Sequence, residues 1–308
     1  MSAILDRILK KIGDQEIMDK LLSLSKSDLN SLLLELFEKQ TNKFIPTDML
    51  KAYRSNRFAT HSEADPGKFH ALEVLLLTVA QEMDIKTVLL SPTAPLGSCS
   101  VFGCVDQYNV VSALRGTEIL SDPSNMLAII IADKLRNKTA SNRLPLHYAT
   151  TARVVRAQEF AGTASFAHFG LYCMISSGRD IGSYACEKEL LEKHLLFYKV
   201  MLKAQFKSKM SIVLRKRSGY NDINGFFEQM TEVVQSMLPD TPLSFDLDDV
   251  DNKYYQGINF KIYMETADEK FEIGDGGFVD WFNQMLGSKK ERGLISGIGL
   301  DRLLLLDR

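Results

Sequence analysis

Residues 293–303 have the sequence GLISGIGLDRL, in which small residues alternate with apolar ones. This alternation is typical of a strand whose one face is closely approached by a ligand or by another backbone. The run then enters a helix that begins with an acid and an arginine, Asp301 and Arg302. An arginine at such a junction can make charge-assisted contacts to a phosphate. A tight strand–helix junction with a surface Asp–Arg pair explains the same residues equally well.

Two further segments have residues suited to a ligand site. A strand-like run at 148–155 is followed by a polar loop, and Arg153 and Arg156 lie where the strand gives way to the loop. Arginines there could neutralise a phosphoryl group, although an exposed hairpin with solvated arginines is the plainer interpretation. Later, Tyr254 and Tyr255 precede a strand, and the pair Gly276–Gly277 follows a turn. Glycines permit close approach of the main chain to a small molecule. A hairpin turn followed by the start of a helix is the alternative interpretation of the same residues.

The apolar periodicities outside these segments predict an α+β fold, with an antiparallel or mixed sheet flanked by helices. No glycine fingerprint of a dinucleotide or Walker site is present. Helical spacing runs through residues 1–45, with Ser27 as an N-cap, until Pro46 breaks it and a loop follows at Ser55–Gly67. The other predicted helices are Lys68–Met83, Met126–Arg136, Tyr184–Ala204, Gly225–Met237 and Phe278–Leu286. The predicted strands are Lys86–Pro92, Val110–Leu114, Tyr148–Val155, Phe169–Ser176, Gly257–Glu265 and Lys270–Ile273.

Composition narrows the function classes. The 37 basic and 39 acidic residues give a net charge of −2, which does not support a protein built mainly to grip nucleic acid. We interpret the short basic cluster as solvated surface; it consists of Lys207, Lys209, Arg215, Lys216 and Arg217. No apolar run is long enough for a membrane helix and no signal peptide is recognisable, which predicts a cytoplasmic protein. The four cysteines form no CxxC pair, so we expect buried or half-buried thiols rather than a zinc or disulfide framework.

Taken in order, the segments resemble class II aminoacyl-tRNA synthetases, specifically the histidyl branch and its paralogue, the regulatory subunit of ATP phosphoribosyltransferase. Lys86–Pro92 resembles motif 1, residues 153–156 resemble motif 2 and residues 297–302 resemble motif 3. Tyr254-Tyr-Gln-Gly resembles the histidyl Tyr-Tyr-Thr-Gly, and residues 276–280 resemble Gly-Gly-Arg-Tyr-Asp. The resemblance extends from about Lys68 to the C-terminus, and its collinearity has more weight than any single motif.

The resemblance implies a class II synthetase-like core at residues 61–308, preceded by an N-terminal helical extension at residues 1–60. It also implies an ATP site, in which Arg153 faces the α-phosphate and Arg302 the γ-phosphate as catalytic groups. Arg156, Gly297 and Gly299 would complete the nucleotide site. Mg²⁺ is expected because ATP normally travels with it. Motif 1 builds the dimer interface in this family, so the resemblance implies a homodimer.

The departures from the family pattern lie at substrate-facing positions. Val155 replaces the adenine-side glutamate and cannot accept a hydrogen bond. Val250 falls where the histidyl enzymes have a catalytic arginine. His168 and Tyr172 occupy the positions that recognise histidine, which implies a different substrate. The residues expected to bind that substrate are His168, Tyr172, Asp122, Asn125, Tyr254, Tyr255, Gly276 and Gly277.

Two hypotheses follow from this pattern. The first is an ATP-dependent enzyme that activates a small carboxylate, an amino acid or an analogue, for an acceptor other than tRNA. The second is a non-catalytic regulatory subunit that binds a small ligand and a partner enzyme. A plain structural dimer is a third reading. The sequence ends six residues after Arg302, where the histidyl enzymes continue into an anticodon-binding domain, so tRNA is not the expected partner.

Overall fold

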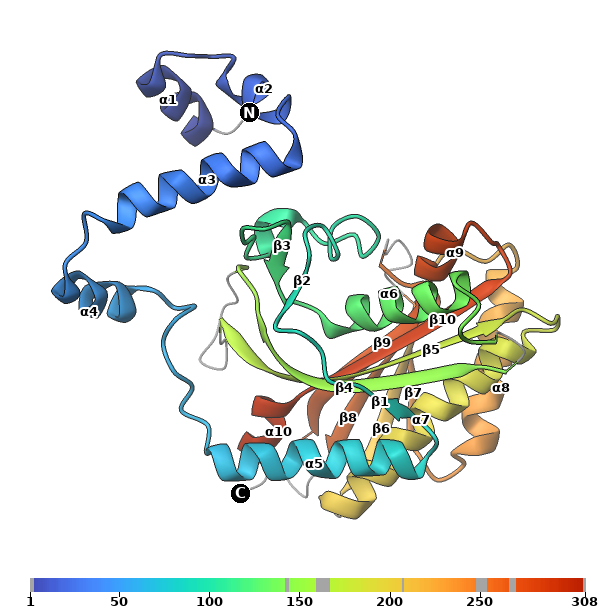
Figure 1. The fold of residues 1–308 in the computed structure, drawn as a ribbon. Coiled ribbons are helices and arrows are strands. Elements are labelled where there is room, and N and C mark those ends of the chain that lie inside the picture. The colour runs from blue at the N-terminus through green and yellow to red at the C-terminus, as the bar shows by residue number, and fades with distance from the viewer. Residues whose placement is uncertain are drawn as a thin grey trace.

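The computed structural model describes residues 3–141, 144–158, 167–206, 208–247, 254–265 and 270–306, and Figure 1 shows their arrangement. Within these residues an eight-stranded sheet has the order β1-β4-β5-β10-β9-β8-β6-β7. Its pairs are antiparallel except for β1–β4 and β6–β7, which are parallel. The predicted mixed sheet is therefore confirmed. In sheet order the strands are Lys86–Thr87, Leu146–Val155, His168–Arg179, Glu291–Gly299, Lys270–Val279, Gln256–Glu265, Lys209–Lys216 and Leu243–Asp246.

Helices cover both faces of the sheet, and each face has its own apolar core (Figure 1). One face packs against α5 (Pro66–Glu82), α7 (Ala185–Gln205), α8 (Ile223–Met237) and α10 (Leu300–Leu306). The other packs against α6 (Pro123–Arg136) and α9 (Trp281–Leu286). On β10, Leu294 belongs to the first core and Ile295 to the second, as the two-residue period of a strand requires.

The N-terminal segment is helical, as predicted, and Figure 1 shows it apart from the sheet. Its helices are α1 (Ala3–Ile12), α2 (Ile17–Leu22), α3 (Lys26–Thr41) and α4 (Pro46–Ser55). The predicted N-cap was wrong by two residues, because Ser25 rather than Ser27 accepts a bond from the Asp28 amide at 3.0 Å. Pro46 begins a helix instead of ending the helical segment, since its fixed φ and missing N–H suit the first helical position.

Other predicted features differ from the structure. Of the predicted strand Lys86–Pro92, only Lys86–Thr87 forms a strand, β1. Val110–Leu114 forms no named strand; Ser112 makes one isolated bridge to Glu118. The run Phe278–Leu286 is divided, because β9 continues to Val279 before α9 starts. The basic cluster is not solvated surface throughout. Residues 209–216 form β6, and Arg217 is 2% exposed with its Nε 2.6 Å from the Asn259 side-chain oxygen. Lys207 lies outside the described residues.

A small two-stranded sheet, β2 (Thr93–Pro95) and β3 (Thr117–Ile119), joins a loop to the main body. Its Glu118 is 0% exposed and accepts from the Gly97 amide at 2.8 Å, the Ser98 hydroxyl at 2.7 Å, the Cys99 amide at 3.2 Å and the Gln107 amide group at 3.1 Å. Burial alone would raise the pKa of Glu118, but these hydrogen bonds outweigh it and lower the pKa. The buried carboxylate thus organises the loop at residues 97–107.

We expect Glu118→Gln to lower the free energy of unfolding by about 2 kcal/mol, because the new amide N–H groups face donors in a buried site. Urea denaturation of the variant beside an exposed control, Glu38→Gln, measures the loss. Equal unfolding midpoints for Glu118→Gln and the wild type would contradict the structural role given to this carboxylate.

Candidate functional site

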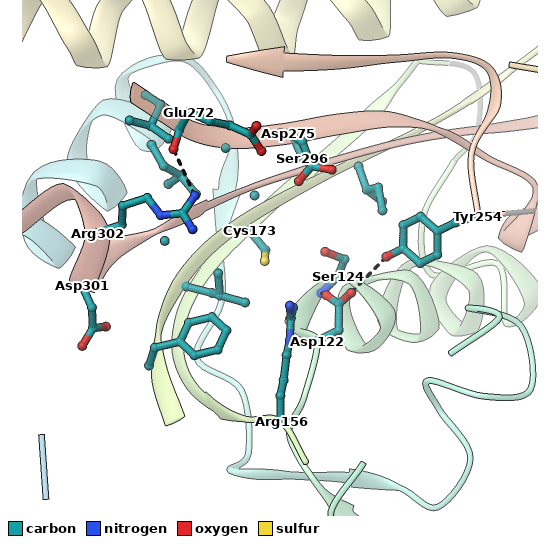
Figure 2. A pocket seen from close by; sticks show the side chains of 18 of the residues that line it. Asp122, Ser124, Arg156, Cys173, Tyr254, Glu272, Asp275, Ser296, Asp301 and Arg302 are labelled. Carbon is teal, nitrogen blue, oxygen red and sulfur yellow. Dashed lines mark hydrogen bonds between the residues drawn. The ribbon is translucent and has the colours of Figure 1, made fainter. Parts of the chain in front are cut away.

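A cavity of about 600 Å³ opens on the α6 side of the sheet (Figure 2). Its wall includes main chain and side chains from β5, β9 and β10, the start of α6, and the first residues of α10. That volume is in the range of small-molecule sites. The polar residues that line it are Asp122, Ser124, Arg156, Cys173, Tyr254, Tyr255, Glu272, Asp275, Ser296, Asp301 and Arg302.

Gly297 and Gly299 lie in the cavity wall at the end of β10. A Cβ on Gly297 would come no closer than 3.5 Å to any neighbouring atom, and a Cβ on Gly299 no closer than 3.8 Å. Both distances are ordinary van der Waals contacts, and neither glycine has a positive φ. Protein packing therefore does not require glycine at these positions, whereas a molecule lying against the strand would.

Two arginines reach the cavity, Arg156 after the end of β4 and Arg302 in the first turn of α10 (Figure 2). The Nε of Arg156 donates to the Ser121 carbonyl at 3.2 Å, and its guanidinium lies 5.3 Å from the centre of the Phe169 ring. Arg302 donates to the Glu272 carbonyl at 3.0 Å. Among the described residues each guanidinium has one neutral acceptor, which leaves further N–H donors for an anionic ligand.

Two aspartates line the cavity beside a pair of tyrosines. Asp122 is the N-cap of α6, where it accepts from the Ser124 amide at 2.9 Å and from the Tyr254 hydroxyl at 3.0 Å. Asp275 accepts from the Tyr255 hydroxyl at 2.9 Å. The confinement of Asp275 among protein atoms raises its pKa; the Tyr255 bond opposes that effect. Consecutive tyrosines thus orient two carboxylates toward one cavity.

Arg153 and His168, which the resemblance assigns to the nucleotide and substrate sites, do not line this cavity. Arg153 lies 5.3 Å from the centre of the Phe69 ring and 3.9 Å from Asp301, and it donates to His168 Nδ1 at 2.7 Å. His168 Nε2 in turn donates to the Thr60 carbonyl at 2.5 Å. The physical reason is strand alternation: Val154 packs toward the cavity side, which turns its neighbour Arg153 toward α5. The structure thus brings Arg156 to the cavity in place of Arg153.

Four other predicted ligand residues have packing roles in the structure. Tyr172 is 0% exposed and stacks on Phe197 at 4.7 Å in the core beneath the sheet. Asn125 is buried and donates to the Ser98 carbonyl at 2.7 Å. A Cβ on Gly276 would meet the Ile295 carbonyl at 2.5 Å, and one on Gly277 would meet the Tyr255 ring at 2.5 Å. These glycines are therefore explained by close packing between strands. Val250 lies outside the described residues.

Several cavity residues were missed by the sequence interpretation: Ser124, Cys173, Glu272, Asp275, Ser296 and Asp301. Asp275 immediately precedes the glycine pair that was singled out, and that proximity was the available signal. Burial raises the pKa of Cys173 to about 12, so this thiol is neutral and is a packing group rather than a nucleophile. Among cysteines, Cys99 and Cys186 are also buried, whereas Cys104 is exposed.

Searches for a metal centre and a membrane span give negative results for the described ranges. No group of three or more histidines, cysteines, aspartates or glutamates in these ranges is arranged to hold a metal ion. No described helix is both long enough and apolar enough to cross a membrane.

Comparison with solved structures identifies the fold of this chain. No family model and no curated protein matches the chain. A solved structure from Bacillus halodurans, described as an ATP phosphoribosyltransferase regulatory subunit/histidyl-tRNA synthetase, is 13% identical with a TM-score of 0.61 and covers 82% of each chain. The apo histidyl-tRNA synthetase of S. aureus is 12% identical with a TM-score of 0.61, covering 82% of this chain and 68% of that one. A putative threonyl-tRNA synthetase from Aeropyrum pernix has a TM-score of 0.62 at 12% identity, covering 78% and 59%. The chain therefore has the predicted class II aminoacyl-tRNA synthetase-like fold.

Proposed function

We propose that this chain binds ATP and a small carboxylate, an amino acid or an analogue, in the cavity, and activates the carboxylate for an acceptor other than tRNA. The observation that supports this most strongly is the glycine-lined wall of β10 with an arginine on either side of it. A flat wall without side chains suits a planar or extended ligand, and the arginines suit its phosphates.

The residues present fit a nucleotide. Arg302 follows the glycine strand directly, as in motif 3, and is exposed with only one hydrogen bond among the described residues. Arg156 supplies the second cation, a role that the sequence pattern had given to Arg153. Gly297 and Gly299 leave room for the ligand against the strand. Mg²⁺ would bind chiefly through the phosphates, with one or two cavity carboxylates, because no three-ligand cluster is present among the described residues.

The residues also fit an amino-acid-like carboxylate. Asp122 is a well-oriented acceptor for an α-ammonium group, since its two neighbours, the Ser124 amide and the Tyr254 hydroxyl, hold it in place. In the proposed reaction a carboxylate oxygen attacks the α-phosphorus of ATP. The bond from that phosphorus to the bridging oxygen of the β-phosphate breaks, and pyrophosphate leaves. The arginines would neutralise charge on the phosphates during this step.

Pyrophosphate exchange, screened over amino acids and other small carboxylic acids, tests this proposal. We expect Arg302→Ala and Arg156→Ala each to reduce exchange by about 100-fold or more, because each removes a cation aimed at the phosphates. Arg54→Ala, at an exposed position on α4, is the matched control and should leave exchange unchanged. Exchange that survives both cavity substitutions would refute the assignment of these arginines.

A regulatory subunit is the alternative. Val155 favours this alternative, because it stands where the family has its adenine-side glutamate. The Bacillus halodurans structure, whose description includes a regulatory subunit, favours it too, since the match covers 82% of each chain. In that case the cavity would bind an amino-acid-like ligand without exchange, and affinity capture with the full chain should recover one dedicated enzyme. A homodimer in the cytoplasm is the assembly and compartment we propose under either function.

A further inference from the structure

The charges that line the cavity are not balanced within the protein. Four carboxylates line it, Asp122, Glu272, Asp275 and Asp301, against the two arginines. Glu272 is paired with Lys261 at 2.7 Å, and Asp301 lies 3.9 Å from Arg153. Asp122 and Asp275 make no ion pair with any described residue. Two carboxylates therefore face the cavity without a protein cation of their own.

Asp275 is the more exposed of these two, and it lines the cavity. It lies on β9 with Gly276 beside it, and its orientation is set by the Tyr255 hydroxyl. Tyr255 is itself fixed edge-on against Tyr254, with ring centres 4.8 Å apart and planes at 90°. The protein atoms around Asp275 and the charge of Glu272 raise its pKa, while the Tyr255 bond and Lys261 oppose that effect.

The two aspartates lie on different elements and are oriented by different tyrosines. Asp122 is held at the N-terminus of α6 by Tyr254, and Asp275 is held on the central sheet by Tyr255. A ligand with two separated cationic groups would neutralise both carboxylates.

We infer that Asp275 determines substrate specificity, by pairing with a positively charged side chain of an amino acid whose α-ammonium lies at Asp122. The substrate class is then a basic amino acid that ends in an ammonium or guanidinium group. This inference rests on the proposed function, because it assigns the substrate of the same cavity. A neutral analogue would leave Asp275 without a cationic partner in the complex, so the cationic ligand should bind more tightly.

The test compares each basic amino acid with a neutral ligand of nearly the same shape. Isothermal titration of the full chain in the presence of MgATP would compare lysine with 6-hydroxynorleucine and arginine with citrulline. We expect one of the two cationic members to bind at least about 10-fold more tightly than its neutral counterpart. Glutamate should not bind measurably, because its side chain would face Asp275.

Asp275→Asn removes the charge while keeping the shape of the side chain. We expect it to reduce the cationic-to-neutral preference to about 1. Asp133→Asn, an exposed position on α6, is the matched control and should keep the preference. If Asp275→Asn does not fold, as judged by circular dichroism, the ligand pairs on the wild-type chain decide alone.

The failures of the two proposals are distinguishable. Binding of ATP together with an amino acid that shows no preference for a cationic side chain would overturn the role of Asp275 and leave the proposed function intact. A wild-type chain that binds neither ATP nor any carboxylate would overturn the proposed function itself. A preference that survives unchanged in Asp275→Asn would place the selecting group elsewhere.

Discussion

Replacing Gly297 by valine should abolish ligand binding while leaving the chain folded. The wall of β10 is open at this position, and the nearest atoms to a Cβ are the Cys173 sulfur and the Tyr172 carbonyl, both at 3.5 Å. A branched side chain would therefore extend into the space that we assign to the ligand. We expect affinity for MgATP to fall by roughly 100-fold or more, since steric overlap in a filled pocket costs several kcal/mol. Isothermal titration measures this loss, and thermal unfolding reports on the fold.

A second glycine substitution provides the contrast. Gly276→Ala places a Cβ 2.5 Å from the Ile295 carbonyl, a backbone atom that cannot move aside. This variant should be clearly less stable than the wild type, whereas Gly297→Ala should unfold near the wild-type temperature. If both alanine variants unfold alike and both bind MgATP normally, Gly297 has no ligand role.

Lowering the pH from 7.5 to 4 should cost the fold several kcal/mol through two histidines. His194 is 0% exposed and bonds to Ser176 Oγ at 2.9 Å and Ser296 Oγ at 2.7 Å; His147 Nδ1 lies 2.6 Å from the same Ser176 hydroxyl. Burial lowers the pKa of His147 from 6.5 to about 4 and that of His194 well below 6.5. Repulsion from Lys193 adds to the effect on His147.

The sign follows from proton linkage. Below pH 6.5 the unfolded chain binds protons at both histidines and the folded chain does not, so stability is full above that pH and falls as the pH falls. By pH 4 the contribution of His147 is about 3 kcal/mol, and His194 adds a loss of its own. Asp275 acts in the opposite sense, because its raised pKa favours the folded state in acid. We expect the histidines to dominate between pH 6.5 and 5.

Urea denaturation at pH 7.5 and at pH 5 checks this prediction. His194→Gln should be less stable than the wild type at pH 7.5, but it should lose less on acidification, since one of the two histidines is gone. His70→Gln is the control, because His70 is an exposed side chain on α5. A wild-type free energy of unfolding that is the same at both pH values would contradict the linkage argument.

The sequence predicted best what depends on local pattern. Gly297, Gly299 and Arg302 line one cavity because a single strand and the first turn of the following helix hold them. The mixed sheet followed from the strand-like runs. The predictions of helix caps and strand ends were less accurate. Ser25 and Ser27 are equally good cap residues by type, and only the hydrogen bond from the Asp28 amide to Ser25 distinguishes them.

To choose between Arg153 and Arg156 as the arginine at the cavity, one must know which face of β4 points toward the cavity. The two residues are three positions apart, and an odd number of positions along a strand reverses the direction of the side chain. Residue type alone does not reveal which face points to the ligand. The packing of Val154 against Leu171 and Cys173 decides it, and those contacts join different strands.

Asp275 and His194 show what sequence pattern cannot supply. The partner of Asp275 is the Tyr255 hydroxyl, 20 positions away, and one partner of His194 is Ser296, 102 positions away. Both contacts are created by the pairing of distant strands and by the docking of α7 on the sheet. No local periodicity identifies such partners, so Asp275 was recognised as a cavity residue only in the folded chain, whereas Asp122 was predicted.

The most direct test of the nucleotide site is isothermal titration of the full chain with ATP and Mg²⁺. We predict saturable binding at one site per chain that is lost in Gly297→Val and retained in Gly67→Ala, a glycine at the start of α5 that does not line the cavity. Wild-type protein that gives no binding heat and no thermal shift at millimolar ATP would contradict the assignment of this cavity to a nucleotide.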